Sequence, residues 1–289
     1  MPLRPEPLQP CRMIELTTNP PGIDPRLQAP PNGYAQARYE PADQERISSE
    51  VVVYNATAPI RVERTLPDTR VSMECVELGS RLDPRLTLLI ALDSPQAKAF
   101  RILRHRLAKT ADPRVIAVTS AERGEGKTTC AVNLALALAE ETLTRVLLFE
   151  ANVRQPALAT LFGFEPRECL SVQMSRLHGP TRGYHIAAIA GTRLCVAAMA
   201  PDLVKGARLD RFLLSVALSE LRSEYDYIVV DTSPALESAD TSSVTACVDG
   251  VLAVARANKS RKRTVRALLE QIGPAPLLGI ALLDSREAA

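Results

Sequence analysis

The 289-residue sequence predicts an α/β fold with a mostly parallel, doubly wound sheet. From residue 115 onward, short apolar runs alternate with longer helical segments, which is typical of strands covered by helices on both faces. One glycine-rich stretch, AERGEGKTT, lies between the first of these runs and a long segment rich in alanine and leucine. This order of strand, loop and helix indicates a site for phosphate groups.

The glycine-rich stretch follows the P-loop pattern [A/G]-x-x-x-x-G-K-[ST], with Ala121 at the first position. Gly124 and Gly126 lack a Cβ, so the backbone can adopt positive φ and approach an oxyanion closely. Lys127 supplies a cation for the β- and γ-phosphates, and Thr128 offers a hydroxyl to Mg²⁺. We therefore predict a fold of the P-loop NTPase type that binds ATP with Mg²⁺. The expected nucleotide-binding residues are Glu122, Arg123, Gly124, Glu125, Gly126, Lys127, Thr128 and Thr129.

A P-loop also needs an acid at the end of a neighbouring strand, where it holds Mg²⁺. The apolar run 225–231 ends in Asp231, so we expect Thr128 and Asp231 to be the metal ligands. Glu150 and Asn152 follow another apolar run and form a second, weaker candidate, because an asparagine carries no charge and cannot act as a base. The expected catalytic residues are Lys127, Asp231, Glu150 and Asn152.

The helix expected before the loop, at 93–110, has clear sequence signals at its N-terminus. Ser94 can cap its N-terminus, and Pro95 suits the first helical position. Apolar residues follow helical spacing on one face, and basic residues such as Arg101 and Arg104 lie on another. The basic face is either solvated or an oligomer contact, and the sequence leaves both alternatives open.

The remaining elements are expected in alternation, and in such a sheet ligands bind at the carboxyl ends of the strands. We expect strands at 115–120, 145–151, 194–199, 225–231, 250–256 and 277–284, helices at 156–162, 209–224, 238–247 and 261–272, and an irregular region at 165–193.

The N-terminal segment, residues 1–80, differs from the rest in composition. Ten of the 22 prolines lie in the first 41 positions, and periodic apolar patterning is sparse. Such a segment cannot bury enough surface to offset its ordering entropy, so we expect it to be largely disordered. Within it, 51–62 is expected to be one short strand, an extended stretch or a docking peptide. The P-loop domain is expected to span 93–284.

The overall composition is that of a globular protein, with 46% hydrophobic and 24% charged residues. The six cysteines are scattered without a C-x-x-C pair, which suits reduced thiols and argues against a metal cluster. No apolar run approaches the roughly 18–20 residues of a membrane span, and the N-terminus lacks a signal-peptide pattern. We therefore expect a cytoplasmic protein. The formal net charge of +2 decides nothing about a nucleic-acid partner.

The chain resembles the bacterial tyrosine kinases of capsule and exopolysaccharide synthesis, which are P-loop proteins related to the partition and septum-placement ATPases. Their phosphate loop is matched by SAERGEGKTT, and their second motif, D-x-D-x-R before a proline, by LLFEANVRQP. Their third motif is matched by IVVDTSPALESAD, which ends at Asp240. Their ring-forming helix, E-A-Y-R-x-L-R, is similar to KAFRILR at 98–104. The resemblance covers residues 93–284 with four motifs in register.

The chain also departs from this family at several motif positions. Glu150 and Asn152 replace the two acids of the second motif, which in the family help to place Mg²⁺ and to activate the attacking group. Ser233 replaces the first proline of the third motif. Lys98 replaces the glutamate of the ring-forming helix, where it adds a like charge beside arginines. The family's C-terminal tyrosine cluster has no counterpart after Tyr227.

The resemblance implies phosphoryl transfer from Mg-ATP, as in a protein-tyrosine kinase or ATPase, and the departures predict reduced activity. The alternative is a nucleotide-dependent switch or scaffold that regulates a polysaccharide export complex. A partition-type ATPase is a weaker alternative, because Glu122 stands where those proteins have a lysine. The implied partners are a membrane polysaccharide co-polymerase or adaptor, which would recruit the chain to the inner face of the plasma membrane, and further copies of the chain. A nucleic-acid partner is not expected, because the basic run at 259–263 fits a solvated helix start.

Overall fold

The computed structural model describes residues 11–13, 63–65, 70–110, 113–176, 183–200, 209–273 and 275–285. The strands in this part of the chain are β1 (Cys11–Met13), β2 (Glu63–Thr65), β3 (Arg70–Val76), β4 (Val115–Ser120), β5 (Val146–Glu150), β6 (Tyr184–Ile189), β7 (Leu194–Ala197), β8 (Tyr227–Asp231), β9 (Gly250–Arg256) and β10 (Leu277–Ser285). The helices are α1 (Thr87–Ile90), α2 (Pro95–Thr110), α3 (Lys127–Ala139), α4 (Leu158–Phe162), α5 (Leu170–Ser175), α6 (Arg211–Leu221), α7 (Asp240–Thr245) and α8 (Lys262–Ile272).

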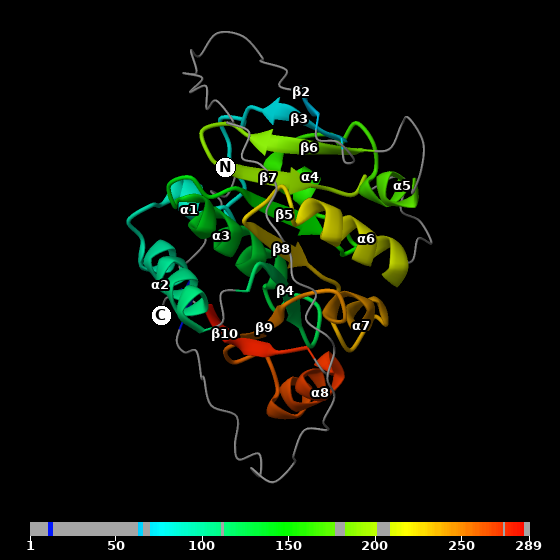
Figure 1. Cartoon of the computed structure of the whole chain (residues 1–289). Coiled ribbons are helices and arrows are strands. Elements are labelled where there is room, and N and C mark those ends of the chain that lie inside the picture. Colours follow the sequence, from blue (N-terminus) through cyan, green and yellow to red (C-terminus); the bar gives the residue numbers. More distant parts are fainter. Residues whose placement is uncertain are drawn as a thin grey trace, which may run out of the picture. The chain divides into compact units, whose positions relative to one another are not determined.

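The strands form one sheet in the order β1-β10-β9-β4-β8-β5-β7-β6-β3-β2 (Figure 1). The central pairs from β10 to β7 are parallel, and so is the β3–β6 pair. The β1–β10, β6–β7 and β2–β3 pairs are antiparallel. Strands β4 and β5 are buried along their whole length, as expected of parallel strands covered on both faces. The predicted mostly parallel α/β sheet is confirmed.

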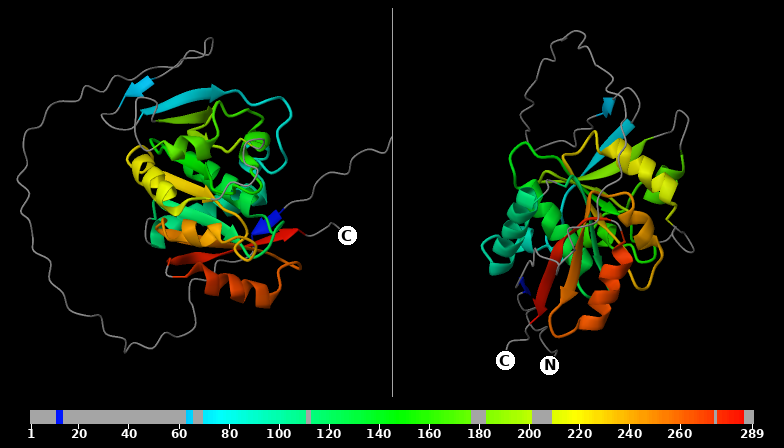
Figure 2. Two further views of the ribbon diagram at one scale, coloured as in Figure 1. Left: turned by 90° about the vertical axis from the view of Figure 1, so that its right-hand side faces the viewer. Right: turned by 60° about the horizontal axis from the view of Figure 1, so that its bottom comes forward.

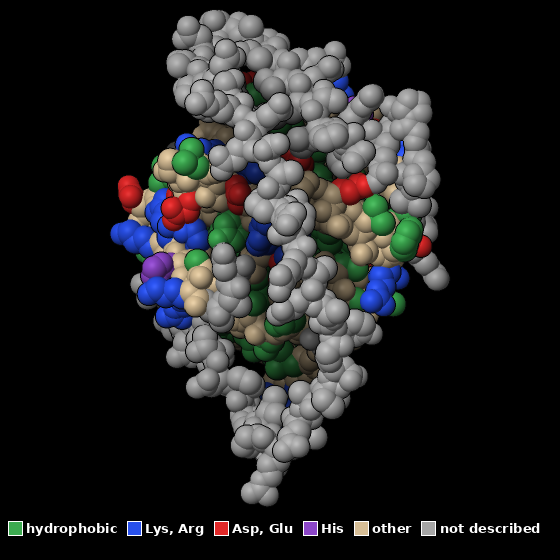
Figure 3. Space-filling view, in the orientation of Figure 1, with side chains coloured by type: hydrophobic (Ala, Val, Ile, Leu, Met, Phe, Trp, Pro, Cys, Tyr) green, Lys and Arg blue, Asp and Glu red, His purple; other side chains and the backbone are tan. Residues whose placement is uncertain are grey.

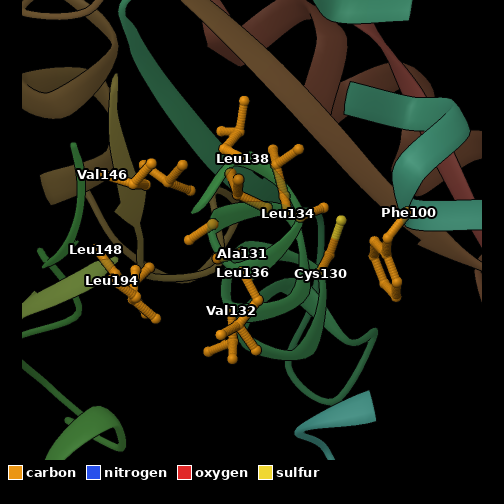
Figure 4. Packing of buried hydrophobic residues seen from close by; sticks show 14 of the residues in the cluster. Phe100, Cys130, Ala131, Val132, Leu134, Leu136, Leu138, Val146, Leu148 and Leu194 are labelled. Carbon is orange, nitrogen blue, oxygen red and sulfur yellow. The ribbon is translucent and has the colours of Figure 1, made fainter. Parts of the chain in front are cut away.

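Helices cover both faces of the sheet, each over its own hydrophobic cluster. On one face α3 lies between α2 and β5, and Figure 4 shows Leu134 and Leu138 of α3 between Phe100 and Val146. On the other face, α5, α6, α7 and α8 each contribute buried residues to the second cluster. The right-hand view of Figure 2 shows α2 and α8 on opposite sides of the sheet. The sheet is therefore doubly wound, as predicted.

Three central strands deliver candidate residues to the same edge of the sheet. β8 lies between β4 and β5, and Asp231 pairs in register with Val118 on one side and with Glu150 on the other. The P-loop leaves the carboxyl end of β4 and leads into α3. Parallel strands thus bring the three predicted motifs together, as the rule for open α/β sheets requires.

Two regions differ from the expectation. The stretch 165–193, expected to be irregular, contains α5 and β6, whose pairing with β7 is antiparallel. The sequence did not reveal β6, because the short segment YHIAAI forms a strand only by pairing with its neighbours β7 and β3. β3 lies within residues 1–80, so ordered structure begins before the predicted domain start at 93. The segment 51–62 and most of 1–80 lie outside the described residues.

Helix α2 begins as predicted, with the Ala97 N–H donating to Ser94 Oγ over 3.1 Å. Its arginines contact acidic residues at the end of α3. Arg101 donates to Glu140 over 2.7 Å, and Arg104 pairs with Glu141 at 2.9 Å. Figure 3 shows basic and acidic side chains intermingled over α2. The basic face is therefore partly neutralised within the chain itself, which a sequence pattern for α2 alone does not reveal.

Candidate nucleotide site

The P-loop connects β4 to α3 through residues in unusual backbone conformations. Gly124 and Gly126 have φ values of +76° and +99°, in the region that favours glycine. A Cβ at Gly126 would come within 2.4 Å of Leu283 Cδ1, so that side chain would have to shift to admit any other residue. Among the described residues, no acceptor contacts the first three amides of α3, and no side chain caps this helix. These free N–H groups at a helix N-terminus suit an oxyanion.

Three loop side chains or amides are engaged within the protein. Glu125 is only 1% exposed, and its carboxylate accepts from the Glu122 N–H over 2.8 Å and from the Ser260 hydroxyl. The Arg123 N–H donates to Glu237 Oε1 over 2.8 Å. Glu122, Arg123 and Glu125 therefore shape the loop through these contacts, and Glu125 ties it to the turn before α8.

Asp231 lies beside Thr128 in the first turn of α3, and one of its carboxylate oxygens has no hydrogen-bond partner among the described residues. Its Oδ2 accepts from Thr128 Oγ1 over 2.8 Å, while Oδ1 is buried without a hydrogen-bond partner. Burial raises the pKa of Asp231 to about 6, although the charges of Lys127 and Arg85 and the Thr128 hydrogen bond oppose this shift. A buried carboxylate oxygen without a donor is costly in a closed protein. Together with the Thr128 hydroxyl, it forms an oxygen donor set of the kind that Mg²⁺ prefers.

Glu150 lies at the end of β5 beside Asp231, and its carboxylate contacts backbone amides. Its Oε1 accepts from the N–H groups of Ala157 (2.5 Å) and Leu158 (3.0 Å), and its Oε2 accepts from the Met199 N–H (2.9 Å). Burial raises the pKa of this carboxyl to about 7, although the three backbone hydrogen bonds oppose the shift. Both oxygens thus hold the start of α4 and the end of β7.

Asn152 also forms hydrogen bonds within the protein. Its Oδ1 accepts from the Ser233 hydroxyl over 3.0 Å, and its Nδ2 donates to the Gln155 carbonyl over 2.9 Å. Asn152 of the second motif and Ser233 of the third motif, which both depart from the family pattern, therefore bond to each other. A carboxylate in place of this amide would bring an oxygen against the Gln155 carbonyl oxygen, which then would lose its donor.

Sequence reasoning missed two contributors near the site. Arg85 binds Asp83 through a bidentate contact, and its charge acts on Asp231. The Arg85 carbonyl accepts from Asn133 Nδ2, which also donates to the Thr129 carbonyl in the first turn of α3. No motif marks Arg85. It lies before α1 and α2 in the sequence, and only the tertiary contact with Asn133 places it near the site. A buried asparagine in the alanine- and leucine-rich helix was the available signal.

The structure therefore divides the predicted catalytic and metal-binding residues into two groups. Lys127, Thr128 and Asp231 lie together, with Lys127 buried and its charge acting on Asp231. Glu150 and Asn152 end in contacts with the protein backbone and Ser233. The second motif also supplies Arg154, which pairs with Asp240 of the third motif at 3.6 Å.

Comparison with known proteins identifies the family. A family model described as an AAA domain matches residues 113–275, more than half of the chain. The chain belongs to this family. It is 28% identical over 191 residues to the tyrosine-protein kinase YwqD of Bacillus subtilis, covering 64% of this chain and 78% of YwqD. The resemblance to the bacterial tyrosine kinases is confirmed, and the P-loop ATPase fold of this family implies nucleotide binding with Mg²⁺.

Two further matches extend this picture. The succinoglycan biosynthesis transport protein ExoP of Rhizobium meliloti is 28% identical over 205 residues, covering 67% of this chain. The chain spans about a quarter of the length of that relative (26%). The crystal structure of the VpsO kinase domain superposes with a TM-score of 0.53 at 27% identity, covering 63% of this chain and 90% of that one. In the described part of the chain, no helix is both long and apolar enough to cross a bilayer.

Proposed function

We propose that this chain binds Mg-ATP at its P-loop and transfers the γ-phosphoryl group slowly, as a divergent relative of the tyrosine kinases of exopolysaccharide synthesis. The observation that carries the proposal is the buried, unpartnered Asp231 Oδ1 beside Thr128 and Lys127. Thr128 and Asp231 would hold the metal, and Lys127 with the free amides of α3 would hold the phosphates. When bound, Mg²⁺ neutralises charge that develops on the phosphate oxygens.

Calorimetry with the full chain tests the nucleotide site. We expect ATP to bind in the presence of Mg²⁺ and Lys127→Ala to weaken it at least about tenfold, because a charge-assisted contact to phosphate is lost. Lys262→Ala, a matched change at an exposed lysine of α8, should leave the affinity unchanged. Equal ATP affinity in Lys127→Ala and the native chain would overturn the assignment of the loop.

A second function is favoured by the saturated side chains of the second motif. Because Glu150 and Asn152 are held by protein groups, neither supplies a free acid to activate an attacking hydroxyl. This arrangement suits a nucleotide-dependent switch that binds ATP and turns it over poorly. For the switch, ATP should protect the chain from proteolysis while phosphotransfer stays far below that of the intact relative YwqD. Phosphotransfer as fast as that of YwqD would exclude it.

The partner proposed for either function is a membrane component of a polysaccharide export system. The support is the relative named as a succinoglycan biosynthesis transport protein, of which this chain matches about a quarter (26%). Co-purification from membranes should depend on whether ATP or ADP is present, since a switch must bind its partner differently in its two states. Equal recovery with both nucleotides would contradict this part of the proposal.

A further inference from the structure

A cavity lies at the opposite end of the central strands from the P-loop. It has a volume of about 290 Å³ and is lined at the amino ends of the central strands by Arg145 before β5, Leu194 of β7 and Tyr225 before β8. β5 runs from this edge to Glu150, and at roughly 3.3 Å per residue its length separates the two sites by roughly 15 Å. The cavity is therefore distinct from the nucleotide site. Its volume lies near the lower end of small-molecule pockets.

The floor of this cavity is apolar and neutral. The Tyr225 hydroxyl and the Cys195 thiol are hydrogen-bonded to each other, and burial raises the pKa of Cys195 to about 11. Both groups stay protonated at neutral pH and are already paired, so they do not recruit a charged ligand. The rest of the floor consists of aliphatic or thioether side chains from three strands, namely Val71, Met73, Ala188 and Leu194.

Among the described residues, two charged side chains on the rim, Glu224 and Arg193, have no ion-pair partner. Arg145 pairs with Asp226 at 3.7 Å, and Glu224 accepts from the Ser223 hydroxyl over 3.4 Å. Arg193 lines the cavity in the β6–β7 turn and has no hydrogen bond or ion pair with any described residue. An apolar floor beside the guanidinium of Arg193, which no described residue pairs, is complementary to an apolar ligand that ends in an anion.

Leu143, also on the rim, is unusual in two independent ways. It is 87% exposed, and its φ of +69° lies in the left-handed region that bulky residues avoid. The exposure of this large apolar side chain and its backbone strain both raise the free energy of the chain without a ligand. Strained residues of this kind gather at ligand-binding positions. A ligand in the cavity would cover the Leu143 side chain and so offset its exposure.

We propose that this cavity binds a small organic anion with an apolar body, whose anionic group pairs with Arg193 and whose body contacts Leu143 and the apolar floor. This binding site is additional to the proposed function, because no residue of the nucleotide site lines the cavity. Carboxylates and phosphates both provide the anionic group, and a matched neutral compound separates charge recognition from simple burial of apolar surface.

Ligand-observed NMR titration of the full chain with 4-phenylbutyrate and with 4-phenylbutan-1-ol tests the proposal. The two compounds share an apolar body and differ in charge. We expect 4-phenylbutyrate to bind saturably with a dissociation constant on the order of 1 mM, as ordinary ligand efficiency gives for its size. The alcohol should bind at least about threefold more weakly, because it cannot form the charge-assisted contact.

Two variants locate the binding. Arg193→Met should reduce the affinity for the acid to that for the alcohol, whereas Arg263→Met, at an exposed arginine of α8, should change neither. Leu143→Gly should weaken both compounds, and it should fold well because glycine tolerates the positive φ. Unchanged ATP binding confirms that each variant is folded. Equal affinities for acid and alcohol, acid binding that survives Arg193→Met, or no saturable binding of the acid would each overturn the proposal.

Discussion

Asn152→Asp is the change that most sharply tests how this site departs from its relatives. It replaces an amide by a carboxyl group in a residue that is 4% exposed and restores one of the two acids of the family's second motif. In the structure, Asn152 Nδ2 donates to the Gln155 carbonyl over 2.9 Å. A carboxylate at this position would place an oxygen against that carbonyl oxygen and leave both without a donor. The variant should therefore gain turnover and lose stability at once.

The structure sets the size of both effects. Losing this buried hydrogen bond and leaving its acceptor unpaired costs about 1–3 kcal/mol in free energy of unfolding. For a domain of this size that corresponds to a Tm lower by about 3–10 °C. One preorganised electrostatic group changes turnover by roughly 10²–10³-fold, so we expect a gain of at least about tenfold in ATP hydrolysis or phosphotransfer. Mg-ATP should recover part of the lost Tm, because it binds only the folded state.

The assay pairs thermal unfolding, with and without Mg-ATP, with steady-state phosphate release. Ser233→Ala is the matched control, because it removes the other hydrogen bond of Asn152, at 3.0 Å, without adding a charge. It should cost about 1 kcal/mol in free energy of unfolding and leave turnover unchanged. An Asn152→Asp chain with native Tm and native turnover would refute the reasoning. Native turnover as fast as that of YwqD would remove the need for the switch.

Three further predictions follow from individual contacts. Burial raises the pKa of Glu150 to about 7, so the stability that this group contributes is present below about pH 4.5 and lost as the pH rises through 7. Unfolding titrations should show Glu150→Gln with a flatter pH profile than the native chain, by roughly 3 kcal/mol over that window; identical profiles would contradict it. Gly126→Ala should abolish ATP binding in calorimetry and lower the Tm, because its φ is +99° and its Cβ would meet Leu283 at 2.4 Å; native affinity would count against it. Glu140→Gln should destabilise α2 by about 0.2–1 kcal/mol in denaturant unfolding, less at high salt, because Arg101 loses an ion pair of 2.6 Å; a salt-independent loss would point to packing.

Several features of the chain were determined by the sequence alone. The glycines, Lys127 and Thr128 stand in an order that only a strand, loop and helix can use, and Asp231 ends a buried apolar strand. These signals are local, because each rests on residues a few positions apart whose backbone requirements are fixed by chemistry. The alternation of strands and helices likewise predicted the doubly wound sheet, and the predicted elements lie within a few residues of their observed bounds, whereas β3, α1, α5 and β6 were not predicted.

Only the tertiary structure decided what Glu150, Asn152 and Arg85 do. Glu150 and Asn152 looked like weakened acids in a motif, but their partners are the amides of α4 and β7 and the Ser233 hydroxyl, which the sheet brings close from distant positions. Arg85 reaches the site because Asn133 anchors its carbonyl to α3. The physical reason is common to all three. Packing between segments that the sequence separates widely decides which groups lie within hydrogen-bonding or electrostatic reach of each other.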